Sequence, residues 1–201
     1  MLKNKLWNAI EARRSFYALN DEIPYTPEEL KELIDFAVMH VPSAFNCQST
    51  RTVFLAGKQH HKLWDIVKEE LREIVPAEAF QATEQKIDTS FKAGYGTILY
   101  FIDDRVTQGL MNQYPTYAKN FPIWAEQSSG MHQYTIWTML VDLGLGVSVQ
   151  HYNPLIDEAV YKTWNIDRNW RLIAQMPFGK PIEKPGEKTF EPIEERSLMF
   201  K

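Results

Sequence analysis

The 201-residue chain is 44% hydrophobic and 13% aromatic, which predicts one packed domain or one protomer of an intertwined dimer. Its net charge of −4, with basic residues scattered along the chain, argues against nucleic-acid binding, because neutralising phosphates requires a basic face. A single cysteine excludes an internal disulfide and suits a reducing cytoplasm. The charged start of the chain predicts no signal peptide. No apolar run approaches the roughly 20 residues of a membrane span, so we expect a cytoplasmic protein with no membrane contact.

The first half of the chain contains a strong helix start. Thr26 can cap the helix, Pro27 suits its first turn, and Glu29 completes a capping box with the threonine. Pro42 ends the same helix, because the residue before a proline avoids helical geometry. The other elements that apolar spacing predicts in this half are helices at 3–13, 59–75 and 77–92 and strands at 52–56 and 97–102.

The second half is dominated by a long apolar segment, residues 123–143. It is too polar for a membrane span and predicts a central buried helix. Asn153 and Pro154 predict another helix start, with asparagine as the cap and proline at the first position. Prolines exclude a regular helix from the tail, residues 180–201, which is expected to lie extended, with a partner subunit as one surface to cover it. The remaining predicted elements are strands at 147–150 and 172–178, the second one ended by Gly179. Helices interspersed with strands indicate an α/β or an α+β domain.

The segment 42–49 reads Pro-Ser-Ala-Phe-Asn-Cys-Gln-Ser and separates a helical pattern from an extended one. Its serine, asparagine and glutamine side chains offer hydrogen-bond donors and acceptors with little bulk, which suits the edge of a planar polar ring. A structural interpretation fits the same pattern, since Ser43 can cap a turn and Asn46 can satisfy backbone amides. Cys47 has no base close to it in the sequence, so a chemical role for its thiol is not favoured.

Basic residues near both ends of the chain are candidates for holding a phosphate. Arg13 and Arg14 end the first predicted helix, where they either complement the helix dipole or clamp a phosphate with their guanidinium groups. Lys188 is either an exposed tail lysine or a further phosphate contact. His60 and His61 are adjacent and so face different sides of a helix, which disfavours a metal pair, and the sequence predicts no metal site.

Four segments occur in an order that resembles the FMN-dependent nitroreductase family. They are the Arg-Arg-Ser start at 13–15, the 42–49 loop, Ala-Gly-Tyr-Gly-Thr at 93–97 and Gln-His-Tyr-Asn-Pro at 150–154. The similarity covers nearly the whole chain and is strongest to the branch that includes the yeast fatty-acid-repression-mutant protein and bacterial copper-induced nitroreductases. It implies an α+β fold, a nitroreductase-like mixed sheet surrounded by helices, with residues 1–201 as a single domain in an intertwined homodimer.

The resemblance also implies which residues bind FMN. They are Arg13, Arg14, Ser15, Pro42, Ser43, Ala44, Phe45, Asn46, Gln48, Gln150, His151 and Lys188. The chain departs from the family pattern at Tyr17 and Phe190, where relatives carry arginine, so its phosphate site is expected to be less positive unless Arg196 substitutes. Gln150 and His151 stand where relatives have an acidic residue and a glycine; a proton-transfer role for this histidine is the minor alternative to a structural one.

The implied activity is an NAD(P)H-dependent oxidoreductase that reduces nitroaromatics, quinones or similar small-molecule acceptors. A flavin that meets the reductant and the acceptor in turn gives a ping-pong mechanism, and because the flavin carries the chemistry no side chain is expected to be catalytic. A role in oxidative or metal stress is the expected context. The alternative is a flavin-binding regulatory or stress protein with little turnover, related to lipid signalling. The sequence leaves the physiological acceptor and the choice between NADH and NADPH open.

Overall fold

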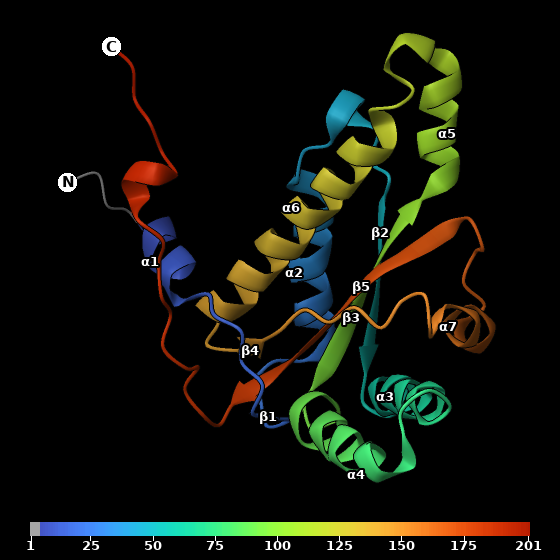
Figure 1. Ribbon diagram of the computed structural model, residues 1–201, viewed down its shortest axis with the longest axis vertical. Helices are drawn as coiled ribbons and strands as arrows, with labels where there is room; N and C mark the ends of the chain where they lie inside the picture. Colours follow the sequence, from blue (N-terminus) through green and yellow to red (C-terminus); the bar gives the residue numbers. More distant parts are fainter. Residues whose placement is uncertain (1–4) are drawn as a thin grey trace.

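The computed structural model describes residues 5–201 and contains a five-stranded sheet with helices packed around it (Figure 1). The strands lie in the order β1-β5-β3-β2, with β4 also paired to β5, and all of these pairs are antiparallel. A bridge between Ser15 and Val147 adds a parallel pairing. The strands are β1 (Leu19–Asn20), β2 (Thr50–Ala56), β3 (Gly96–Asp103), β4 (Gly146–Val147) and β5 (Trp170–Pro181).

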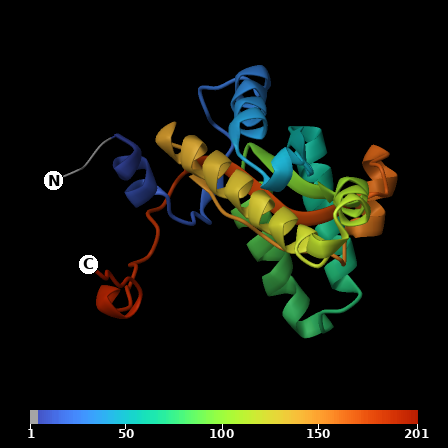
Figure 2. The same ribbon diagram turned by 90° about the horizontal axis from the view of Figure 1, so that it is seen from above.

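Helices cover the sheet on both sides, as the view from above shows (Figure 2). The α-helices are α1 (Lys5–Ala12), α2 (Pro27–His40), α3 (Lys58–Arg72), α4 (Ala77–Lys86), α5 (Asp104–Gln113), α6 (Phe121–Asp142) and α7 (Asp157–Trp164). The shorter helical segments are η1 (Ala44–Asn46), η2 (Ile87–Lys92), η3 (Pro115–Tyr117) and η4 (Ile193–Glu195).

Strand β3 lies at the centre of the molecule, because every one of its 8 residues is buried. Ile98 and Tyr100 belong to one hydrophobic core with side chains of α2 and α6, whereas Leu99 and Phe101 belong to a second core with side chains of α3 and α7. Successive side chains of a strand point to opposite faces, so the unbroken apolar run of β3 fills both cores. The expected α+β fold is confirmed.

The helix start predicted at Thr26 is confirmed in detail. The hydroxyl of Thr26 accepts a hydrogen bond from the backbone N–H of Glu29 at 3.2 Å, and the Glu29 carboxylate accepts one from the Thr26 N–H at 2.8 Å. The predicted helix at 77–92 is α4 continued by the wider, π-helical turns of η2. The first predicted helix is α1, and its expected residues 3 and 4 lie outside the described part of the chain.

The helix start predicted at Asn153 and Pro154 is wrong. Residues 153–156 form turns, the peptide bond between Asn153 and Pro154 is cis, and α7 begins at Asp157. The Asn153 side chain does not cap a helix because its Oδ1 accepts a hydrogen bond from Nε2 of Gln175, at 3.3 Å. The strand predicted at 147–150 is also shorter, since β4 ends at Val147.

Gly179 does not end the last strand, because β5 continues to Pro181. A Cβ atom at Gly179 would collide with the backbone oxygen of Asn20 in β1, so the glycine permits a close approach of two strands rather than a turn. One helix was not predicted at all. Residues 104–113 form α5, a short helix whose one buried residue is the polar Thr107 and whose apolar residues Val106, Leu110 and Met111 are only partly buried.

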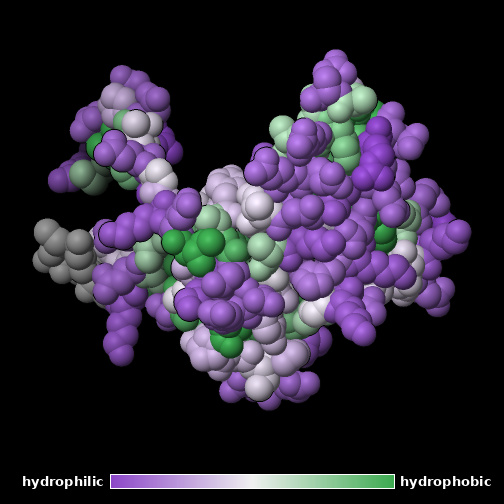
Figure 3. All heavy atoms as spheres, turned by 90° about the horizontal axis from the view of Figure 1, so that it is seen from below, coloured by the Kyte–Doolittle hydropathy of each residue, from purple (hydrophilic) through white to green (hydrophobic). Residues whose placement is uncertain are grey.

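Beyond Pro181 the chain leaves the sheet and runs as an extended tail with η4 as its one helical turn in the described structure. Figure 3 shows the end of this tail as a lobe set apart from the body, with hydrophobic residues among hydrophilic ones. Its exposed apolar side chains are Ile182, Phe190, Ile193, Leu198, Met199 and Phe200. A run of exposed apolar side chains of this kind is typical of a surface that a partner covers.

Candidate functional site

The N-terminal segment and the C-terminal tail form a cavity of about 530 Å³. Residues 13–18 line one side and residues 183–188 line the other, so Arg13, Arg14, Ser15 and Lys188 meet as the sequence analysis predicted. We refer to this space as the terminal cavity. Its lining carries four cationic side chains and two anionic ones, Glu183 and Glu187 being the acids, which leaves a net positive charge suited to an anion.

The two arginines of the terminal cavity are held in different ways. Nη2 of Arg14 donates a hydrogen bond to the backbone oxygen of Gly186 at 2.5 Å and so ties the tail to the N-terminal segment. The guanidinium of Arg13 lies over the ring of Trp137 in α6, 4.6 Å from the ring centroid. This cation–π contact restrains the arginine while its N–H groups stay available to a ligand. Sequence reasoning missed Trp137, since 124 residues separate it from Arg13 and its helical spacing indicated only a core position.

The lysine and the arginine of the tail differ in their distance from the cavity. Lys188 lines it, and its Nζ lies 4.9 Å from the ring centroid of Phe190, the residue that stands in place of a family arginine. Arg196 follows η4 and is not among the residues of the terminal cavity. Tyr17 lines the cavity and contacts Phe91 edge-on, with centroids 6.4 Å apart.

A backbone connection runs from the terminal cavity to the segment that contains Gln150. Ser15 pairs with Val147, and the N–H of Phe16 donates to the Val147 oxygen at 3.0 Å. Gln150 then pairs with Gln175 of β5, and its Nε2 donates to Oγ of Ser148 at 3.1 Å. The bridge to β5 therefore fixes Gln150 in the segment that follows β4, three residues beyond the partner of Ser15.

His151 lies on a different cavity from Arg13 and Lys188. This second cavity, of about 380 Å³, is also lined by Glu126, Asp157 and Arg171. Burial, and secondarily the nearby Glu158, raises the pKa of Asp157, whose Oδ1 is buried with no hydrogen-bond partner in the described structure. Within one protomer the structure therefore does not bring His151 into the terminal cavity.

The 42–49 loop has an unusual backbone. Phe45, Asn46 and Gln48 have φ angles of 57°, 49° and 50°, a left-handed region that is costly for residues with a side chain. The Ser43 hydroxyl does not cap η1; it accepts a hydrogen bond from the N–H of Gln48 at 2.9 Å and closes the loop. Cys47 is partly buried, with Sγ 3.7 Å from Oγ of Ser49.

An aromatic cluster packs around Phe45. Its ring lies 5.3 Å from Phe121 and 6.0 Å from Trp124, with the latter nearly parallel at an interplanar angle of 21°. Tyr114, between α5 and η3, and Tyr117, the last residue of η3, lie 5.1 and 6.1 Å away. Phe45 itself is 51% exposed, so the cluster offers an open aromatic surface beside the loop.

The 42–49 loop and the segments that line the terminal cavity lie at opposite ends of α6 (Figure 1). Phe45 packs on Trp124 near the start of this helix, whereas Arg13 packs on Trp137 near its end. These two tryptophans are thirteen positions apart, which corresponds to roughly 20 Å along a helix. Accordingly, none of Pro42, Ser43, Ala44, Phe45, Asn46 and Gln48 lines the terminal cavity of the same protomer.

Two further classes of site are absent from the described residues. Among residues 5–201, no cluster of three or more histidine, cysteine, aspartate or glutamate side chains is placed to hold a metal ion. In the same part of the chain, no helix combines the length and the apolarity needed to cross a membrane. His60 and His61 do not form a pair of metal ligands, because His60 is buried against Thr97 whereas His61 is exposed.

Comparison with known proteins connects this geometry to a family. Residues 10–180 match the model of the nitroreductase family. The chain is 34% identical to the nitroreductase FRM2 of Saccharomyces cerevisiae over 185 residues, which covers 91% of each chain.

Solved structures show the same similarity. The nitroreductase CinD from Lactococcus lactis in complex with chloramphenicol superimposes with a TM-score of 0.90 at 42% identity, covering 98% of this chain and 100% of that one. Other structures of CinD contain nicotinic acid or 4-nitrophenol. A nitroreductase with bound FMN from Desulfitobacterium hafniense shares the fold at 16% identity, with a TM-score of 0.72 and coverage of 99% of each chain.

Proposed function

Since the chain belongs to the nitroreductase family, we propose that it is an FMN-dependent oxidoreductase that takes electrons from NAD(P)H and reduces nitroaromatic compounds, quinones or similar acceptors. The observation that carries the proposal is the terminal cavity, in which Arg13, Arg14, Ser15 and Lys188 converge from opposite ends of the sequence. The flavin-bound relative from Desulfitobacterium hafniense supports the choice of FMN.

The terminal cavity fits the phosphate end of FMN. Guanidinium groups donate pairs of parallel hydrogen bonds, a geometry that matches phosphate oxygens, and an ammonium group adds a further positive charge. Arg13, Arg14 and Lys188 would hold the phosphate, and Ser15 would contact the polar atoms next to it. The acids Glu183 and Glu187 reduce the net charge of the cavity, as the replacement of family arginines by Tyr17 and Phe190 also does.

A second copy of the chain would complete the ring-binding part of the site. Two protomers whose α6 helices pack antiparallel would bring the 42–49 loop of one protomer to the terminal cavity of the other, because these features lie at opposite ends of α6. Exposed apolar side chains on α2 and α6 of each protomer support such packing. They are Phe36 and Met39 of α2 and Ile123, Met131 and Tyr134 of α6.

When bound, FMN supplies hydride acceptance from NAD(P)H and electron transfer to the second substrate. The protein would orient the ring and exclude water from it, with Ser43, Asn46 and Gln48 facing it from the partner and Gln150 bordering it from the same chain, whereas His151 lies on the second cavity. One ring face used by the two substrates in succession gives the ping-pong kinetics of the proposal. The CinD complexes with the nitro compounds chloramphenicol and 4-nitrophenol support nitroaromatic acceptors.

The alternative, a flavin-binding regulatory or stress protein with low turnover, draws on the similarity to FRM2. The two proposals make different predictions for bound flavin. An oxidoreductase must be bleached at flavin wavelengths by NADH or NADPH within the time of one turnover and recover its colour when 4-nitrophenol or a quinone is added. Flavin that stays bound and oxidised under NADH and NADPH would favour the regulatory protein, and a purified protein that takes up no FMN would contradict both.

A further inference from the structure

The 42–49 loop is the most strained segment of the described chain, and its own contacts explain only part of its shape. Three of its residues without glycine's freedom, Phe45, Asn46 and Gln48, occupy left-handed backbone geometry. Such backbone geometry is strained and persists only where the surroundings hold it. The bond between Ser43 and Gln48 and the packing of the Phe45 ring supply two restraints.

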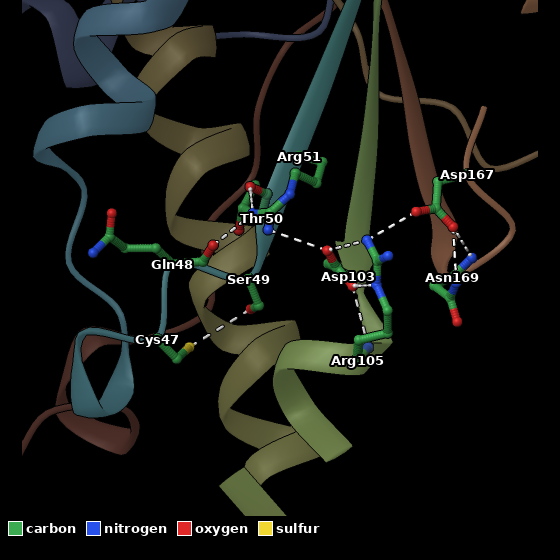
Figure 4. A network of polar contacts seen from close by, with 9 residues as sticks. All are labelled: Cys47, Gln48, Ser49, Thr50, Arg51, Asp103, Arg105, Asp167 and Asn169. Atoms are coloured by element: carbon green, nitrogen blue, oxygen red, sulfur yellow. Dashed lines mark hydrogen bonds and ion pairs between the residues drawn. The ribbon is translucent and has the colours of Figure 1, made fainter. Parts of the chain in front are cut away.

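The third restraint comes from outside the loop, from Arg51 at the start of β2. Its Nη1 donates to the backbone oxygen of Gln48 at 2.6 Å and to that of Thr50 at 3.1 Å. Figure 4 shows that the same guanidinium reaches away from the loop toward Asp103, where Nη2 donates to Oδ2 at 3.1 Å. Arg51 therefore links the strained loop to the central strand.

Asp103 is a firm anchor for this link. It closes β3, its side chain is only 4% exposed, and its backbone N–H donates to the Ser49 oxygen at 2.9 Å. Arg105 binds both carboxylate oxygens, at 3.1 and 3.0 Å, and continues to Asp167 at 2.8 Å. Arg105 chiefly, together with Arg51, holds the pKa of Asp103 below its ordinary value, so the carboxylate is charged at neutral pH.

We infer that Arg51 is a positioning residue for the flavin: by joining the Gln48 carbonyl to Asp103, it fixes the 42–49 loop in the geometry that faces the flavin ring of the partner subunit. This inference rests on the proposed function for its flavin part, while the restraint on the loop is independent of any cofactor. Nothing in the sequence indicates it, because Arg51 only precedes the strand predicted at 52–56 and Asp103 lies 52 positions away.

Arg105 provides a matched control. Arg51 and Arg105 both pair with Asp103. Of the two, only Arg51 also donates a hydrogen bond to the loop, whereas Arg105 continues to Asp167. Arg51→Met and Arg105→Met each remove one cation from the same carboxylate and keep an unbranched side chain. A loss of general stability should affect both variants, whereas a loss of loop position should affect Arg51→Met alone.

The first measurement is amide hydrogen exchange in purified protein without added flavin. Asn46, Cys47 and Gln48 donate their backbone N–H groups within the loop. We expect these three amides to exchange about 10-fold faster or more in Arg51→Met, and within about 2-fold of the original rate in Arg105→Met, since only the former loses a hydrogen bond from a charged group to the loop itself. Unchanged exchange of β3 amides shows in each case that the fold is intact.

The second measurement compares riboflavin and FMN binding. Arg51→Met should weaken both by a similar factor, about 10-fold, because the loop faces the ring and not the phosphate. Arg51→Lys, which keeps the positive charge but loses the planar guanidinium that joins the Gln48 carbonyl to Asp103, should give an intermediate loss. Equal effects of Arg51→Met and Arg105→Met on the loop amides, or no effect of either, would overturn the inference; an original protein that binds no FMN would instead overturn the proposed function and leave the exchange result standing.

Discussion

Strand β3 and the 42–49 loop show two ways in which this chain holds a segment in place. Every residue of β3 is buried, the strand lies between two antiparallel neighbours, and its apolar side chains fill two cores. The loop has few ladder contacts, three left-handed residues and an aromatic ring that is half exposed. It is restrained by single polar contacts, namely Ser43 to Gln48 and Arg51 to Gln48.

The strand serves the folding of the protomer, whereas the loop serves the proposed cofactor site. One chain supplies everything that β3 needs, so the sheet forms within the protomer. The loop presents its polar and aromatic groups outward, which is expected of a surface that is completed by a cofactor and a second copy. Substitutions in the two regions should accordingly differ in size and in kind.

The largest effect is expected in the core. Phe101→Ala should lower the free energy of unfolding by about 3–5 kcal/mol, since it leaves a cavity between β3 and the helices of the second core. Phe45→Ala should cost only about 1 kcal/mol, because that ring is half exposed and loses mainly aromatic pair contacts. Chemical denaturation of both variants at one protein concentration measures the difference, and equal costs would refute the comparison.

The core should also make stability depend on pH through His60. Its Nδ1 lies 2.9 Å from Oγ1 of Thr97 and its Nε2 lies 3.1 Å from the Lys92 oxygen, and burial, followed by weaker charge effects, lowers its pKa to about 4. Above pH 6.5 the histidine is neutral in both the folded and the unfolded chain and adds no pH dependence. As pH falls from 6.5 to 4, the unfolded chain takes up a proton that the folded chain does not, so stability should fall by up to about 3 kcal/mol.

Unfolding curves at several pH values test this expectation. His60→Gln should flatten the pH dependence between pH 6.5 and 4, and the exposed neighbour His61→Gln should leave it unchanged. A curve for His60→Gln as steep as that of the original protein would show that other groups cause the acid sensitivity.

At the cofactor site the effects should be smaller and specific to one end of the ligand. Arg13→Ala and Lys188→Ala are each expected to weaken FMN binding by about 1–3 kcal/mol, because a charge-assisted contact to phosphate is lost, while riboflavin binding changes little. Arg196→Ala should change neither, since this arginine lies outside the terminal cavity. Equal losses for FMN and riboflavin would mean that the residue does not contact phosphate.

The smallest effect is expected at Cys47. Cys47→Ser should keep most of the nitroaromatic or quinone reductase activity, because the contact to Ser49 is weak and a route through flavin needs no thiol. Steady-state assays with NADH and with NADPH measure this. A loss of several orders of magnitude with flavin still bound would give the thiol a chemical role and contradict the mechanism.

Local patterns explain what was predictable in the fold. The capping box at Thr26 involves residues three positions apart. The continuous apolar run of β3 is typical of a strand that is buried on both faces of a sheet. The cap predicted at Asn153 was wrong because Gln175, 22 residues later, engages its side chain. A contact over that separation leaves no periodic trace in the sequence.

The same rule applies to the candidate site. The basic residues and the loop were recognised from short motifs, whereas Trp137 beneath Arg13 and Asp103 beyond Arg51 depend on folding. The resemblance implied an intertwined homodimer, whereas the distance along α6 that separates the loop from the terminal cavity within one protomer depends on folding.

The central claim, a flavin site shared between two copies, has a direct test by mixing two defective chains. One chain carries Arg13→Ala and Lys188→Ala and lacks the phosphate contacts; the other carries Asn46→Ala and Gln48→Ala and lacks the ring contacts. Each alone should form a dimer of about twice 23.5 kDa with weak FMN binding. After equal mixing and subunit exchange, about one quarter of the sites should bind FMN with the original affinity, because each mixed two-fold dimer contains one intact site. Confirmed mixed dimers with no recovered binding, or a monomer that retains flavin, would contradict the account.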